Sequence, residues 1–292
     1  MRTALTGMLA GTLLFAAPVQ AFNFGALGNA LGIDPKTTKR IEQVARVASA
    51  LVPISEAEEK VLGRDVAARV AGRFGIDPDQ NRTYYLNLLG TTLAQHSDRP
   101  NLGYHFAILD TDDVNAYSCP GGYIFVTRGA MNMAQDEAEL AAILTHEIGH
   151  VTEKHIIKAL QQSKLMQVGS EVAADAFKNP AGSALFSKMS DFATDALFKG
   201  LSKKDEYDAD RVSVVYLSRV GYDYPAMNDV LKLLNVRRKQ GLTRVLSKTH
   251  PSPTSRLRAL KKAEKSMHLD APTGIRLKQR FVRYTEARKN AS

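Results

Sequence analysis

The hydrophobic residues between positions 53 and 75 are spaced as on one face of a helix. Apolar side chains recur there every four residues: Leu62, Val66, Val70 and Phe74. Ser55 and Glu58 precede them at capping-box spacing, in which each side chain satisfies a free backbone group at the helix start. Gly75 follows the last apolar residue, so the helix is expected to end there.

Two later regions also show helical spacing. The second helix is expected from about Gln80 to Gln95, with three residues on its inner side: Tyr84, Leu88 and Leu89. From Asp136 onward the pattern is helical, with breaks where Gly and Pro gather: 179–182, 221–225, 241 and 251–253. Within it, Ala184–Phe198 has a continuous apolar face. That face is expected to pack on the core, with a lid over a cleft or a membrane contact as the alternatives.

A two-residue period separates these helical regions. In residues 104–109, Phe106 and Ile108 alternate with their neighbours, which predicts a half-buried strand. Residues 114–117 and 123–127 are two more strand candidates, divided by a Cys-Pro-Gly-Gly break at 119–122. The fold class is therefore α+β, mostly helical, with one small sheet.

Composition and charge refine this picture. Hydrophobic residues make up 44% and charged residues 24%, which is ordinary for a folded protein. The single cysteine, Cys119, excludes an internal disulfide and a cysteine metal cluster, and we interpret it as a small apolar core residue. Residues 1–21 have the pattern of a secretory signal: Arg2, a short apolar run and small residues before position 22. The protein is thus expected to be exported.

The stretch His146-Glu147-Ile148-Gly149-His150 carries the clearest chemistry. On a helix, His146 and His150 lie one turn apart, so both imidazoles can reach one zinc ion. Glu147 lies beside them and can act as the general base of a metalloprotease. Glu137 to Leu144 are strong helix formers and lead directly into this motif.

Zinc in a catalytic site usually has a third protein ligand. His155 is the nearest candidate, but it lies one position short of the elongated form of the motif, so we interpret it as solvated or structural. Glu206 and Asp210 are the better pair, because a spacing of four places both carboxylates on one helical face. One can bind zinc while the other accepts the free N–H of a ligand histidine. We assign Glu206 as the ligand and Asp210 as its support.

Three motifs in this order resemble the HtpX and CaaX-prenyl-protease group of zinc metallopeptidases, metallopeptidase family 48: Pro120–Gly129, His146–His150 and Glu206-x-x-x-Asp210. The likeness covers about residues 53–265 and is closest to soluble, exported members. It implies a zincin-like (gluzincin) domain with the sheet beside the active-site helix. The chain then divides into a signal peptide (1–21), an N-terminal helical segment (22–52), a protease domain (53–270) and a basic C-terminal tail (271–292).

The resemblance also implies roles for residues outside these motifs. In the family an edge strand pairs with the substrate backbone, which corresponds here to Asn115-Ala116-Tyr117 and Gly122–Val126, so Asn115, Ala116, Gly122 and Tyr123 become candidate substrate contacts. An ordinary internal hairpin is the alternative. His250 and Arg256 match a family pair that stabilises the oxyanion of the tetrahedral intermediate. His250 could instead fill the fourth position on zinc and gate the site.

The function expected from these residues is an exported, periplasmic zinc endopeptidase, with one Zn²⁺ per chain, that cleaves unfolded or misassembled polypeptides. A chaperone-like or regulatory protein with a gated, largely silent zinc site is the alternative. Residues 232–292 hold 17 basic and 3 acidic residues, whereas the rest of the chain sums to −5. This basic region is expected to contact an anionic membrane surface or to form a solvated face. Nucleic acid is not an expected partner, because no aromatic residues interleave with the cations.

Overall fold

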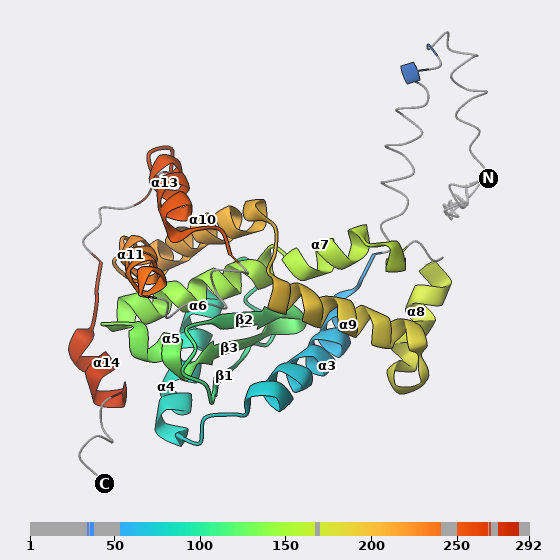
Figure 1. Cartoon of the computed structure of the whole chain (residues 1–292), viewed down its shortest axis with the longest axis horizontal. Helices are drawn as coiled ribbons and strands as arrows, with labels where there is room; N and C mark the ends of the chain where they lie inside the picture. Colours follow the sequence, from blue (N-terminus) through green and yellow to red (C-terminus); the bar gives the residue numbers. More distant parts are fainter. Residues whose placement is uncertain are drawn as a thin grey trace, which may run out of the picture. The chain divides into compact units, whose positions relative to one another are not determined.

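The computed structural model describes residues 34, 36–37, 53–166, 170–240, 250–267, 269 and 274–285 (Figure 1). The chain divides into two compact units, residues 1–51 and 52–292. The predicted signal peptide lies outside the described residues, as does the predicted segment 22–52 apart from residues 34, 36 and 37. None of the helices in the described part of the chain combines the length and the apolar character needed to cross a membrane.

The second unit is mostly helical and contains a three-stranded sheet (Figure 1). Its helices and strands are α3 (Glu56–Phe74), α4 (Gln80–Gln95), β1 (His105–Leu109), β2 (Ala116–Cys119), β3 (Tyr123–Thr127), α5 (Arg128–Met133), α6 (Glu137–Thr152), α7 (His155–Gln162), α8 (Ser170–Lys178), α9 (Ala184–Lys199), α10 (Lys203–Val220), α11 (Ala226–Lys239), α13 (Pro253–Glu264) and α14 (Lys278–Thr285). Short 3-10 turns lie at Pro120–Gly122, Lys164–Met166 and Pro180–Gly182. The α+β class predicted from the sequence is confirmed.

The first two helices form where the sequence predicts them. Ser55 and Glu58 form the capping box at the start of α3, and Gly75 ends the helix with a positive φ of 73°. In α4, however, the predicted inner face is wrong for two residues, because Tyr84 is 60% exposed and Leu88 is 49% exposed. Tyr85 is buried instead, since its ring stacks on Tyr284 and its hydroxyl donates to a Glu137 carboxylate at 2.9 Å.

The sheet has the strand order β1-β3-β2. Strand β3 runs parallel to β1 and antiparallel to β2, so its backbone is paired on both sides. Strand β2 occupies residues 116–119 rather than the predicted 114–117. The half-buried strand predicted at 104–109 is covered on both faces, because Phe106 and Ile108 are buried on one face and Leu109 on the other.

Two hydrophobic clusters lie on the two faces of the sheet. One joins Phe106, Ile108 and Val126 to apolar residues of α4, α6, α10 and α11. The other joins Tyr117, Cys119 and other strand residues to α3, α7 and α9. Cys119 is fully buried, as expected for an apolar core residue. The apolar face of α9 packs in this second cluster, which confirms the packing interpretation.

Residues 274–285, which belong to the predicted basic C-terminal tail (271–292), pack against the helices of the second unit. Phe281 of α14 is buried in the cluster of α4 and α6. Arg276 binds Asp136 at 2.7 Å, and Arg280 binds Glu137 through its Nε atom at 2.6 Å. Part of the C-terminal positive charge is therefore neutralised inside the fold, at the start of α6.

Candidate active site

Helices α6 and α10 cross closely, and this crossing positions the site. Gly149 of α6 faces Ala209 of α10, and a Cβ atom on Gly149 would lie 3.4 Å from the Ala209 backbone. One helical turn away, the Thr145 and Ser213 hydroxyls lie 2.7 Å apart in a hydrogen bond. The small residues and the hydrogen bond thus fix the position of α6 relative to α10. The functional side chains of both helices meet beside this contact.

His146 and His150 of α6 converge with Glu206 of α10. The two Nε2 atoms are 3.2 Å apart, and they lie 3.7 and 3.6 Å, respectively, from the Glu206 carboxylate oxygens. Ligand atoms at ~2.0–2.1 Å from a tetrahedral zinc ion are about 3.3–3.5 Å apart. The three side chains therefore fit a zinc ion, and among the described residues they form the one His, Cys, Asp or Glu group close enough to share a metal.

Glu206 supplies a further sign that this cluster is a metal site. Its carboxylate is fully buried, and its Oε1 atom has no hydrogen-bond partner. Burial alone would raise the pKa of Glu206, but His250, Arg256 and His150 hold that pKa well below its usual range. Arg256 lies near Oε2, so the unsatisfied Oε1 atom beside His150 is the part of this carboxylate that a metal ion would bind.

Asp210 contacts the outer nitrogen of His146, and Arg256 in turn binds Asp210. The Asp210 Oδ1 atom is 3.0 Å from His146 Nδ1, so the carboxylate can accept a proton held on that nitrogen. Arg256, on α13, donates to both oxygens of Asp210, at 2.5 and 2.9 Å, and is itself buried. Burial opposes ionisation of Asp210, but Arg256 and His146 keep its pKa below the usual value. The structure thus places Asp210 where the sequence predicts a supporting carboxylate.

The loop before α13 brings His250 to the same site. Its Nδ1 atom is 2.6 Å from Glu206 Oε2, and its side chain is half-buried. His250 is not one of the three residues whose atoms could share a metal. The residues immediately before it, 241–249, lie outside the described part of the chain.

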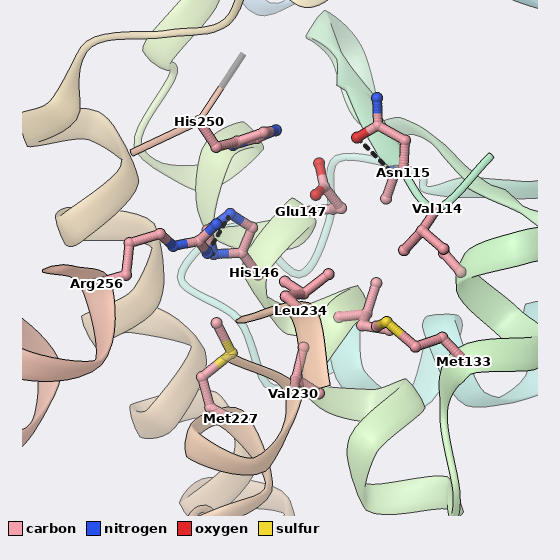
Figure 2. A pocket seen from close by; sticks show the side chains of 13 residues that line it. Val114, Asn115, Met133, His146, Glu147, Met227, Val230, Leu234, His250 and Arg256 are labelled. Carbon is pink, nitrogen blue, oxygen red and sulfur yellow. Dashed lines mark hydrogen bonds between the residues drawn. The ribbon is translucent and has the colours of Figure 1, made fainter. Parts of the chain in front are cut away.

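Glu147 is buried near His146 and lines a pocket (Figure 2). Burial raises the pKa of its carboxyl, while His146 and the Ser118 hydroxyl partly oppose that shift. A raised pKa brings a carboxylate closer to neutral pH, where a general base works best. Glu147 therefore has the position and the environment of a proton acceptor next to the candidate metal.

The pocket itself is mostly apolar. Figure 2 shows His146, Glu147, His250 and Arg256 around one part of it, with apolar side chains of several elements beside them. These apolar residues are Val114, Ala116, Ala130, Met133, Ile143, Met227, Val230 and Leu234. Three of them belong to α11, about eighty residues after the histidine motif. The sequence analysis did not identify these three residues. An apolar helix face predicts burial, but it does not show which element the face packs against.

The candidate substrate-binding residues separate into two pairs. Asn115 and Ala116 line the pocket at the start of β2, which is an outer strand of the sheet. The Asn115 side chain accepts from the Ala116 N–H at 3.0 Å. Gly122 and Tyr123, by contrast, lie outside the pocket lining, and the interpretation of Gly122–Val126 as an edge is wrong because β3 is the central strand. Tyr123 stacks on His105 instead.

His155 is structural rather than solvated. It is buried, and its Nδ1 atom lies 2.8 Å from Nδ1 of His150. It offers no atom to the cluster of His146, His150 and Glu206, in agreement with the sequence argument against it as a third ligand.

Comparisons with known proteins point to a peptidase family. The model of peptidase family M48 matches residues 80–264, which is more than half of the chain. The chain is 28% identical to the Beta-barrel assembly-enhancing protease of Escherichia coli K12 over 212 residues, covering 70% of this chain and 43% of that protein. It is 24% identical to the Mitochondrial metalloendopeptidase OMA1 of Schizosaccharomyces pombe over 207 residues, 69% of this chain and 60% of that one.

A third relative is shorter. The chain is 28% identical to Metalloprotease YcaL of Escherichia coli K12 over 152 residues, which cover 52% of this chain and 59% of that protein. The chain spans less than half the length of the assembly-enhancing protease it matches. The matched region contains all three candidate metal ligands, Glu147, His250 and Arg256. The chain therefore belongs to peptidase family M48.

Proposed function

We propose that this protein is an exported zinc endopeptidase of the periplasm that cleaves unfolded or misassembled polypeptides. The observation that carries the proposal is the convergence of His146, His150 and Glu206 at zinc-ligand spacing, with Glu147 beside them at an apolar pocket. Similarity to the Beta-barrel assembly-enhancing protease supports a role in quality control of the cell envelope. The pattern of residues 1–21 supports export.

The residues divide the chemistry among them. When bound, zinc would polarise the scissile carbonyl and lower the pKa of water. Glu147 would accept the proton of the attacking water and pass it to the leaving amine. The outer strand β2, which begins at Ala116 beside the pocket, would pair with the substrate backbone, with Asn115 next to it. Binding of this kind depends little on the side chains of the substrate. An extended, unfolded segment meets this requirement, and the apolar pocket would receive one hydrophobic side chain of it.

The zinc ligand set can be tested by metal content. Purified protein is expected to contain one zinc per chain, and Glu206→Ala should lose most of it because the two histidines alone leave the ion short of a ligand. Asp210→Asn is the matched control on the same helix: it should keep the metal with an affinity weakened ~10–100-fold. Elemental analysis and chelator competition measure both. Full zinc content in Glu206→Ala would remove Glu206 from the ligand set.

His250 has two proposed roles, and one variant separates them. As an oxyanion donor, His250 contributes to the transition state, so His250→Ala should reduce turnover of an unfolded substrate ~10²–10³-fold with zinc retained. As a gate, its contact with Glu206 restricts the site, and His250→Ala should raise turnover. We favour the donor role. Unchanged turnover would contradict both roles, and a large increase would favour the regulatory, gated alternative.

We assign Arg256 a positioning role in place of the oxyanion contact expected from the family resemblance. Its Nε and one Nη atom already bind Asp210, and the other Nη atom lies 3.4 Å from Glu206. Because the guanidinium contacts both buried carboxylates, it holds Asp210 and Glu206 in position at the metal site. The remaining cations of residues 232–292 are proposed to contact anionic lipid headgroups, with a solvated basic face as the alternative.

A further inference from the structure

The two histidines of the metal cluster have different partners at their outer nitrogens. His146 Nδ1 faces the Asp210 carboxylate at 3.0 Å. His150 Nδ1 faces another histidine, because His155 Nδ1 lies 2.8 Å away. Both rings of this second pair are buried and meet edge to face, with centroids 4.9 Å apart and planes at 72°. A buried imidazole pair at this distance requires one nitrogen to donate and the other to accept.

The positions of the ring nitrogens determine which histidine donates. His150 Nε2 faces His146 and Glu206, so it is the atom available to a metal and carries no proton when it binds. The proton of a neutral His150 ring must then be on Nδ1, which donates to His155. His155 Nδ1 therefore accepts, and the His155 proton is on Nε2. That nitrogen faces Asp205 Oδ1 at 3.7 Å, where the carboxylate favours a proton on the near side of the ring.

The backbone is shaped to make this contact. Helix α6 ends at Thr152, and α7 begins at His155, so two residues separate the helices. Lys154 is in the left-handed conformation, with φ 54° and ψ 38°, which is uncommon for a residue other than glycine. This turn reverses the chain direction enough for the His155 side chain to contact His150 of α6. Strain of this kind persists only where surrounding contacts support it.

Asp205 is also held in place. Its side chain accepts from the Ser202 N–H at 3.1 Å in the capping box of α10. Asp205, which faces His155, and Glu206, the third candidate ligand, are consecutive residues in the first turn of α10. The chain of contacts from His150 through His155 to Asp205 thus links both helices that carry metal ligands.

We propose that His155 is a positioning residue for the zinc ligand His150, which it holds in the Nδ1–H tautomer while Asp205 orients His155. The role differs from that of Asp210, because the acceptor is a neutral ring rather than a carboxylate. His155 does not touch the metal. The inference depends on zinc binding at this site and not on which polypeptide is cleaved.

Zinc affinity, measured by chelator competition with zinc alone, tests this role. His155→Phe keeps a buried ring but removes the acceptor, and affinity is expected to fall ~10–100-fold, the range for partners of ligand histidines. His155→Asn places an amide oxygen close to the position of Nδ1, so it should recover most of the affinity. His96→Phe makes the same change at an exposed histidine that directly follows α4 and should have no effect.

Two further readouts separate positioning from general damage to the fold. Thermal unfolding of the zinc-free protein should be similar for His155→Asn and the wild type, and nitrogen NMR should show the His150 proton on Nδ1 in the zinc-bound wild type. Unchanged zinc affinity in His155→Phe, or an Asn variant as weak as the Phe variant, would overturn the positioning role. A wild-type protein that binds no zinc would overturn the metal site itself and this inference with it.

Discussion

Glu147→Gln is expected to reduce hydrolysis of an unfolded polypeptide by ~10²–10⁴-fold, the usual contribution of a general base. The amide has nearly the same shape as the carboxylate but cannot accept the proton of the attacking water. Because Glu147 is not among the residues whose atoms could share a metal, zinc content should stay at the wild-type value. The measurement is the initial rate of peptide-bond cleavage at matched zinc content.

Ser118, whose hydroxyl contacts the Glu147 carboxyl, provides the control for this experiment. Ser118 partly offsets the pKa rise that burial causes in Glu147, and it has no proposed part in proton transfer. Ser118→Ala should therefore retain most of the activity. A Glu147→Gln protein as active as the wild type would mean that another base, or a contaminating protease, carries out the reaction.

Arg256→Met is expected to destabilise the zinc-free fold by about 3–5 kcal/mol, the range for breaking a buried ion pair by removing one partner. Methionine fills similar space, so the main loss is the positive charge. Asp210 and Glu206 would then remain buried with like charge and without their arginine. Denaturant unfolding in the presence of a chelator measures the free energy of unfolding directly.

A second variant shows whether the charge pair is responsible. Asp210→Asn combined with Arg256→Met removes both members of the pair, so it should be less destabilised than the sum of the single variants. If Arg256 serves only as an oxyanion donor, Arg256→Met will lose turnover, but the free energy of unfolding will fall by no more than about 0.5 kcal/mol, the scale of an ordinary surface change.

The parts of the site that could be predicted from the sequence are those set by local geometry. His146 and His150 are one turn apart on any helix, and the same holds for Glu206 and Asp210. The capping box at Ser55 is equally local, since its partners are three residues apart. Such features depend on helix periodicity alone, and the structure places all of them as expected.

Errors arose where distant contacts decide the outcome. The burial of Tyr85 in place of Tyr84 depends on Glu137 and Tyr284, which lie far along the chain. The central position of β3 depends on a parallel pairing with β1 that the strand pattern does not encode. For His155 the sequence left a solvated and a structural role open, and its burial accompanies a local feature, the left-handed conformation of Lys154, which the residue type does not reveal.

The contacts of residues 274–285 have a consequence for the order in which the fold is completed. Arg276 and Arg280 neutralise Asp136 and Glu137 at the start of α6, yet they are synthesised after every other described element of the unit. Until they leave the ribosome, Glu137 has no cation for a site in which it is fully buried. The start of the helix that carries His146 and His150 is therefore expected to become stable only after residues 274–285 have been synthesised.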